Sequence, residues 1–81
     1  MSDQGIQSLM REIDQRDLVL ALKGAVEPVR EKFLGNMSER VQTFISEEIG
    51  FVRCGPEQVL DAQARILAQV YQLVEEGTIE F

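Results

Sequence analysis

Few residues of this 81-residue chain have the chemistry of a catalytic group, and their spacing does not bring them together. There is no histidine, so proton transfer near neutral pH would need a strongly shifted carboxylate or lysine. Cys54 is the one conceivable nucleophile, but without a histidine base we expect its thiol to be structural or incidental. The adjacent acids Glu47-Glu48 and Glu75-Glu76 point about 100° apart on a helix, so they do not converge on a cation. We therefore expect no catalytic residue, no metal and no cofactor, and the chain is not expected to be an enzyme.

The charge balance restricts the partners. Fourteen acidic and eight basic residues give a net charge of −6, which would repel nucleic acid and anionic membranes. No apolar run approaches the roughly 20 residues that span a bilayer, and the first residues lack the pattern of a signal peptide. A single cysteine cannot form an intrachain disulfide. These observations favour a cytoplasmic protein that works by contact with another protein, without inserting into a membrane.

The apolar pattern predicts an all-α fold, a compact bundle of about five helices in one domain covering residues 1–81. Glycines at positions 24, 50 and 77 are predicted helix stops, and a short extended tail should follow the last helix. The helices should begin near Ser2 or Asp3, at Asp14, at Glu27-Pro28, at Ser38 and at Pro56, and the last and longest should run to about Glu76.

A chain of this length buries only about 60–65% of its surface, so every helix must contribute an apolar face. The second helix is apolar on most sides and should be central. Ile79 and Phe81 of the tail should fold back on the bundle. The predicted buried faces of the other helices are Val29, Phe33, Leu34 and Met37; Val41, Phe44, Ile45 and Ile49; and Val59, Leu60, Ala62, Ile66, Leu67, Val70, Leu73 and Val74.

Charges lie beside the apolar stripe of the fourth helix. On a helical wheel that steps about 100° per residue, Arg40 and Glu47 fall within about 20° of each other on the flank of the stripe, so these two side chains lie one above the other. Glu48 falls only about 20° from Val41, within the stripe, and it lies close to the negative end of the helix dipole. One interpretation is that these are ordinary surface charges, each worth a few tenths of a kcal/mol. The alternative is that these charges form a surface that binds another protein.

Longer sequence matches favour the second interpretation. The stretches DQRDLVLALKGA (residues 14–25) and REKFLGNMSER (residues 30–40), followed by the acid pair Glu47-Glu48, resemble the C-terminal domain of the bacterial flagellar motor switch protein FliG. Asp61-Ala62-Gln63 and the run from Leu73 to Gly77 also fit the last helix of that family. The resemblance covers nearly the whole chain.

The resemblance implies a helical domain at the outer edge of the rotor's cytoplasmic ring, at the cytoplasmic face of the inner membrane in the flagellar basal body. In that family a charged ridge contacts the cytoplasmic loop of the stator, and torque for motility passes through the contact. Other rotor and switch-complex proteins of the chemotaxis-controlled motor are further partners. The ridge residues that carry over are Lys23, Arg40, Glu47 and Glu48, with Arg53 as the candidate for the last one.

Two departures keep other hypotheses open. The family loop usually reads Gly-Pro-Val-Arg, but here Gly-Pro is displaced within residues 50–56, so the alignment of Arg53 stays open. Full-length members also carry further helical regions before this domain, so the chain is either an excised domain or a stand-alone relative. A helical interaction module or paralogue that kept the fold without stator contact is the alternative function, and an enzyme that uses Cys54 is a third. The torque hypothesis predicts that Lys23, Arg40 and Glu47 are exposed along one continuous surface.

Overall fold

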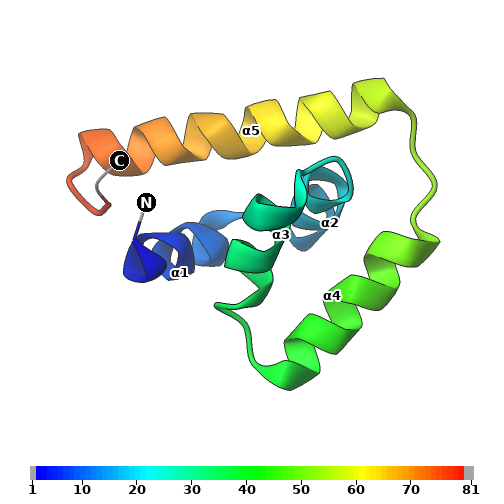
Figure 1. The fold of residues 1–81 in the computed structure, drawn as a ribbon. Coiled ribbons are helices and arrows are strands. Elements are labelled where there is room, and N and C mark those ends of the chain that lie inside the picture. Colours follow the sequence, from blue (N-terminus) through cyan, green and yellow to red (C-terminus); the bar gives the residue numbers. More distant parts are fainter. Residues whose placement is uncertain (1, 80–81) are drawn as a thin grey trace.

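The computed structural model describes residues 2–79, and within that range the chain forms five α-helices joined by short connections (Figure 1). The all-α prediction, the number of helices and the greater length of the last one are confirmed. The helices are α1 (Asp3–Glu12), α2 (Gln15–Lys23), α3 (Glu27–Leu34), α4 (Glu39–Phe51) and α5 (Pro56–Glu75).

Local hydrogen bonds start three of the helices where the sequence predicted. The Gly5 amide donates to Ser2 Oγ at 3.1 Å, the Arg16 amide to Asp14 Oδ1 at 2.8 Å, and the Val41 amide to Ser38 Oγ at 3.3 Å. Each bond satisfies an amide that has no partner inside its helix. The other two helices have proline in their first turn, where the missing N–H costs nothing.

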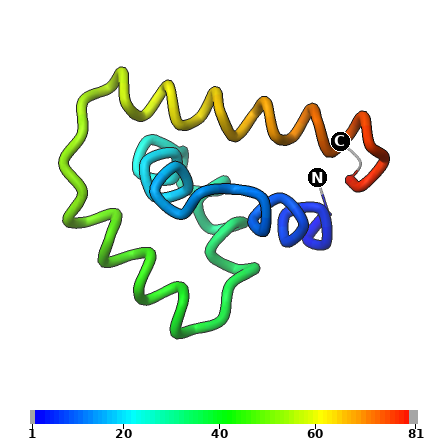
Figure 2. Tube along the Cα trace, turned by 180° about the vertical axis from the view of Figure 1, so that it is seen from behind, coloured from blue at the N-terminus to red at the C-terminus, as the bar shows by residue number. Residues whose placement is uncertain are grey.

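Helix α2 is the centre of the molecule, as its composition predicted. All of its residues from Leu18 to Leu22 are buried, and it packs against both α5 and α4. Helix α5 extends along one side of the molecule and also contacts α1, while α4 lies on the opposite side of α2 (Figures 1 and 2). The buried positions form three clusters: Leu9, Val70, Leu73 and Ile79; Leu18, Val19, Leu22 and Ile45; and Leu20, Ala21 and Ala62.

The buried faces predicted for the outer helices were too wide. Helix α3 has no buried residue, and Val29 is 45% exposed. On α4 only Ile45 is buried, whereas Val41 and Phe44 are nearly half exposed. Leu60 of α5 is 63% exposed. These helices lie at the edge of the molecule, so each has a packed neighbour on only part of its apolar side.

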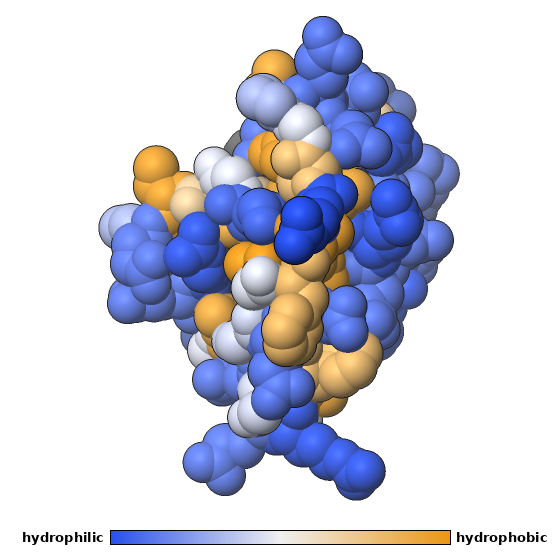
Figure 3. Space-filling view, turned by 90° about the vertical axis from the view of Figure 1, so that its right-hand side faces the viewer, coloured by the Kyte–Doolittle hydropathy of each residue, from blue (hydrophilic) through white to orange (hydrophobic). Residues whose placement is uncertain are grey.

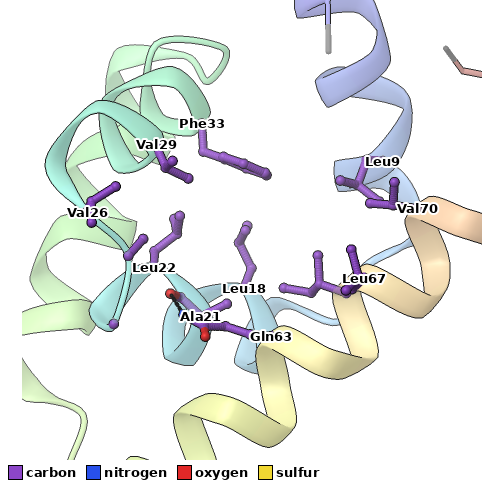
Figure 4. Close-up of a pocket in the computed structure, with 13 residues that line it drawn as sticks. Leu9, Leu18, Ala21, Leu22, Val26, Val29, Phe33, Gln63, Leu67 and Val70 are labelled. Carbon is purple, nitrogen blue, oxygen red and sulfur yellow. Dashed lines mark hydrogen bonds between the residues drawn. The ribbon is translucent and has the colours of Figure 1, made fainter. Parts of the chain in front are cut away.

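An apolar groove explains part of this exposure. It has a volume of about 370 Å³ and lies between α3 and α5, with α2 as its floor (Figure 4). Val29 and Leu67 face it from opposite walls. Among the described residues that line it, Gln63 has the only polar side chain, and its Nε2 donates to the Ala21 carbonyl at 3.2 Å. The groove therefore contains no group that could transfer a proton.

The chain turns sharply after α5. Gly77 has φ +77°, a left-handed conformation that glycine adopts without strain, and the Thr78 amide then donates to the Leu73 carbonyl at 2.9 Å. This turn returns Ile79 to the core, where it is buried, as predicted. The predicted packing of Phe81 lies outside the described residues. None of the helices within residues 2–79 combines the length and the hydrophobicity needed to cross a lipid bilayer.

A candidate charged surface along helix α4

Helix α4 lies at the edge of the molecule (Figure 1) and carries three of the five predicted site residues, Arg40, Glu47 and Glu48. Arg40 and Glu47 are exposed, and Glu48 is partly buried. Seven residues separate Arg40 from Glu47, so the two side chains lie about 10 Å apart along the axis and within about 20° of one direction. We use the term charged ridge for Lys23, Arg40, Glu47, Glu48 and Arg53.

Most ridge charges have no partner within the molecule. Across residues 2–79, the side chains of Arg40, Glu47, Glu48 and Arg53 form neither an ion pair nor a hydrogen bond. The ion pairs of the described chain lie elsewhere and join Arg30 to Glu27, Lys32 to Asp3 and Arg65 to Asp17. The charges on α4 are therefore available to an external partner.

Lys23 differs from the other ridge residues. It ends α2, and although it is exposed, its Nζ donates to the carbonyl of Val52 at 2.7 Å and to that of Ile49 at 3.4 Å. These carbonyls belong to the last turn and the C-cap of α4. The structure thus brings Lys23 to the C-terminal end of α4, next to Arg53, while Arg40 lies in the first turn at the other end.

The segment between α4 and α5 contains Arg53, the candidate for the last ridge residue. It covers residues 52–55, and Arg53 within it is exposed. Seen from this side, the surface is mainly hydrophilic, with a narrow run of hydrophobic residues through it (Figure 3).

Cys54 is half-buried against the cluster of Leu20, Ala21 and Ala62, which fits a packing role. No group of three metal-binding side chains occurs within the described residues.

Arg30 is a structural residue that the sequence did not single out. Its guanidinium donates to the carbonyls of Leu22, Lys23 and Ala25 at 3.1–3.3 Å, and it pairs with Glu27 at 3.1 Å. The three carbonyls lie at and just beyond the end of α2, so one side chain holds the chain where α2 turns into α3. The sequence does not predict these hydrogen bonds. Arg30 lies seven residues after the end of α2, and the conformation of the turn between α2 and α3 determines whether its side chain contacts that end.

Two other ion pairs stabilise the fold away from the ridge. Arg65 Nη2 lies 2.8 Å from Asp17 Oδ1 and joins α5 to α2. This hydrogen bond lowers the pKa of Asp17 below its ordinary value of 3.8, against a smaller opposing effect of burial. At the other end, Lys32 lies 2.9 Å from Asp3 and joins α3 to α1, and its hydrogen bond lowers the pKa of Asp3.

The whole chain matches a known family of proteins. The family described as the FliG C-terminal domain matches residues 1–81. The chain belongs to this family. The resemblance noted in the sequence is therefore confirmed.

Individual FliG proteins show the same relationship. The flagellar motor switch proteins FliG of Pseudomonas aeruginosa and Thermotoga maritima are 40% and 39% identical to 98% of this chain. A crystal structure of FliG from H. pylori superposes with a TM-score of 0.93, at 32% identity, over 98% of this chain and 35% of the solved one. The chain spans about a quarter of the length of the curated relatives, 24% for each of these two. The comparisons indicate no catalytic family.

Proposed function

We propose that this chain is the rotor domain of a flagellar motor switch protein, and that its charged ridge contacts the cytoplasmic loop of a stator to generate torque. One observation carries the proposal. Arg40 and Glu47 have opposite charges, lie two turns apart on helix α4, are exposed and have no partner within residues 2–79.

The physics of exposed charge suits a contact that must form and break repeatedly. An exposed ion pair contributes about 0–1 kcal/mol, so a rotor subunit can leave the stator as easily as it approaches. Charges also act over a Debye length of about 8 Å in physiological salt, so they orient the partner before contact. A large apolar contact would release far more slowly.

The ridge fits a partner that carries both signs of charge. Arg40 at one end of α4 attracts an acidic side chain, whereas Glu47 and Glu48 attract basic ones. Such a pattern sets the register and orientation of a partner segment. In this proposal residues 1–81 act as one helical domain at the cytoplasmic face of the inner membrane, assembled with the other switch-complex proteins of the rotor.

The alternative is an interaction module of the same fold that has no stator contact. The segment at residues 52–55 favours it, because Gly-Pro is displaced there relative to the usual family loop and Arg53 precedes it. If the C-terminal end of the ridge has a different geometry, a stator loop adapted to the usual ridge would fit less well.

Charge reversal in a flagellated cell whose rotor carries this sequence distinguishes the two functions. Arg40→Glu and Glu47→Lys, singly and together, are tested against a stator of normal charge and a stator with weakened loop charges. Torque at high load is measured from the rotation of beads attached to filaments. Arg11→Glu, an exposed reversal on α1, is the matched control.

We expect each α4 reversal to reduce torque, to stop rotation with the weakened stator, and to be relieved by the opposite reversal in the stator loop. The control should rotate normally. All variants should stay folded because the altered side chains are exposed, and their urea midpoints should differ only by the small effect of each charge on its helix dipole. Unchanged torque in both α4 variants with the weakened stator would favour the module without stator contact.

A further inference from the structure

We infer that Lys23 serves the ridge as a positioning residue: its ammonium group holds the C-terminal end of α4 and thereby sets the direction of Glu47, Glu48 and Arg53. This inference rests on the proposed function for its consequence in the motor. It assigns Lys23 a task different from that of Arg40, which is free to meet a partner directly.

The geometry at the end of α4 carries the inference. The last amide bonded back into the helix is that of Val52, which donates to the Glu48 carbonyl at 2.9 Å. The carbonyls beyond this point have no amide within the helix to bind. Lys23 Nζ satisfies two of them, that of Val52 at 2.7 Å and that of Ile49 at 3.4 Å. A lysine ammonium has three donors, so this one is already largely occupied.

Electrostatics explain why α4 needs a cation at this place. Glu47 and Glu48 lie near the C-terminus of α4, where the helix dipole is negative and acidic residues are unfavourable. The last turn of α4 has no basic residue of its own. Lys23 supplies the missing positive charge from another helix, so it compensates for the two acids that the ridge requires.

Few other contacts set the direction of α4. Its only buried residue is Ile45, and the neighbour that it packs against is α2, the helix that ends in Lys23. The backbone of Lys23 is held in turn, because Arg30 Nη2 donates to its carbonyl at 3.3 Å. A series of contacts therefore runs from α3 through the end of α2 to the end of α4.

The first test measures hydrogen exchange of backbone amides in the whole chain carrying Lys23→Met, Lys23→Arg or, as a control, Arg11→Met. Lys23→Met keeps an apolar side chain of similar length and removes the donors. We expect the amides of residues 50–52 to exchange about three to ten times faster, whereas core amides such as those of Leu9 and Ala62 stay unchanged. Lys23→Arg should restore most of the protection, and Arg11→Met should leave it intact. Equal exchange at residues 50–52 in Lys23→Met and the parent would overturn the inference.

The second test determines whether the stator loop contacts Lys23 directly. Lys23→Glu should reduce torque, and reversal of charges in the stator loop should not restore it, because the defect lies in the position of α4. The same stator changes should relieve Arg40→Glu. Restoration of Lys23→Glu by a reversed stator charge would overturn the inference. If neither Arg40→Glu nor Glu47→Lys changes torque with the weakened stator, the proposed function fails, and the exchange result still decides whether Lys23 holds α4.

Discussion

Replacing Gly24 by alanine tests how closely α2 packs on α5. A Cβ at Gly24 would overlap Val59 Cγ1 and lie 3.3 Å from Gln63 Nε2. The backbone is not the obstacle, since φ is −93° and suits any residue. Overpacking of this kind costs about 1–3 kcal/mol, and the lower entropy of the unfolded alanine chain offsets about 0.4–1 kcal/mol. We therefore expect Gly24→Ala to destabilise the chain by roughly 1–2 kcal/mol, which lowers Tm by roughly 4–16 °C.

Urea unfolding followed by circular dichroism measures this effect, and two further variants make it specific. Gly50→Ala is the matched control, because its Cβ would meet nothing within 4 Å and alanine favours a helix interior. We expect that variant to be slightly more stable than the parent. Val59→Ala removes the overlapping methyl, so Gly24→Ala should cost much less in that background. Equal stability of the Gly24 and Gly50 variants, or strict additivity with Val59→Ala, would refute this account of the packing.

Three further predictions concern interactions that hold the fold. Arg30→Met removes the donors to three carbonyls at the end of α2 and should cost about 1–2 kcal/mol in urea unfolding, while Arg30→Lys should lose less. Leu9→Ala leaves a cavity at a fully buried site and should lower the free energy of unfolding by about 3–5 kcal/mol. Leu60→Ala, at an exposed site, should lower it by less than about 1 kcal/mol, and similar losses in the two variants would contradict the core assignment. The hydrogen bond from Arg65 lowers the pKa of Asp17, so its contribution to stability is present above pH 3.8 and is lost as pH falls below that value. Asp17→Asn should therefore show a shallower loss of Tm in acid than the parent, and an unchanged acid profile would contradict this role.

The features that sequence predicted well are those decided by near neighbours along the chain. Asp14 and Ser38 were recognised as caps because a side-chain oxygen reaches amides two or three residues ahead, whatever the rest of the fold does. Gly77 was recognised as a stop because few other residues adopt its positive φ readily. The central place of α2 followed from its apolar residues on most sides.

The width of each buried face could not be predicted in the same way. An apolar stripe shows that a helix packs against something, but the number of its neighbours determines how much of the stripe is covered. Phe44 and Ile45 are adjacent in sequence and similar in hydrophobicity, yet one is 46% exposed and the other 2%. Ile45 packs into the cluster formed with Leu18, Val19 and Leu22 of α2, and Phe44 does not.

The candidate site also combines features that local sequence predicts with features that depend on tertiary contacts. Helical spacing alone placed Arg40 and Glu47 on one side of α4, and the structure leaves both exposed. The bonds of Lys23 were not predictable, because its partners lie 26 and 29 residues further along the chain and reach it only through the turns around α3. Such a contact depends on the angle between two helices, which no local pattern encodes.

A surface that receives force, the role proposed for α4, must be exposed and must also be held firmly. Helix α4 meets the first need by using one side for packing, and its ends meet the second. At the N-terminal end, Ser38 caps the helix and Gln42 Nε2 donates to the Met37 carbonyl at 3.2 Å; at the other end, Lys23 holds the final carbonyls. Under the proposed function, a lateral push on Glu47 would be passed to α2, the most deeply buried helix, through the packing of α4 on α2 and through the bond of Lys23 to the end of α4.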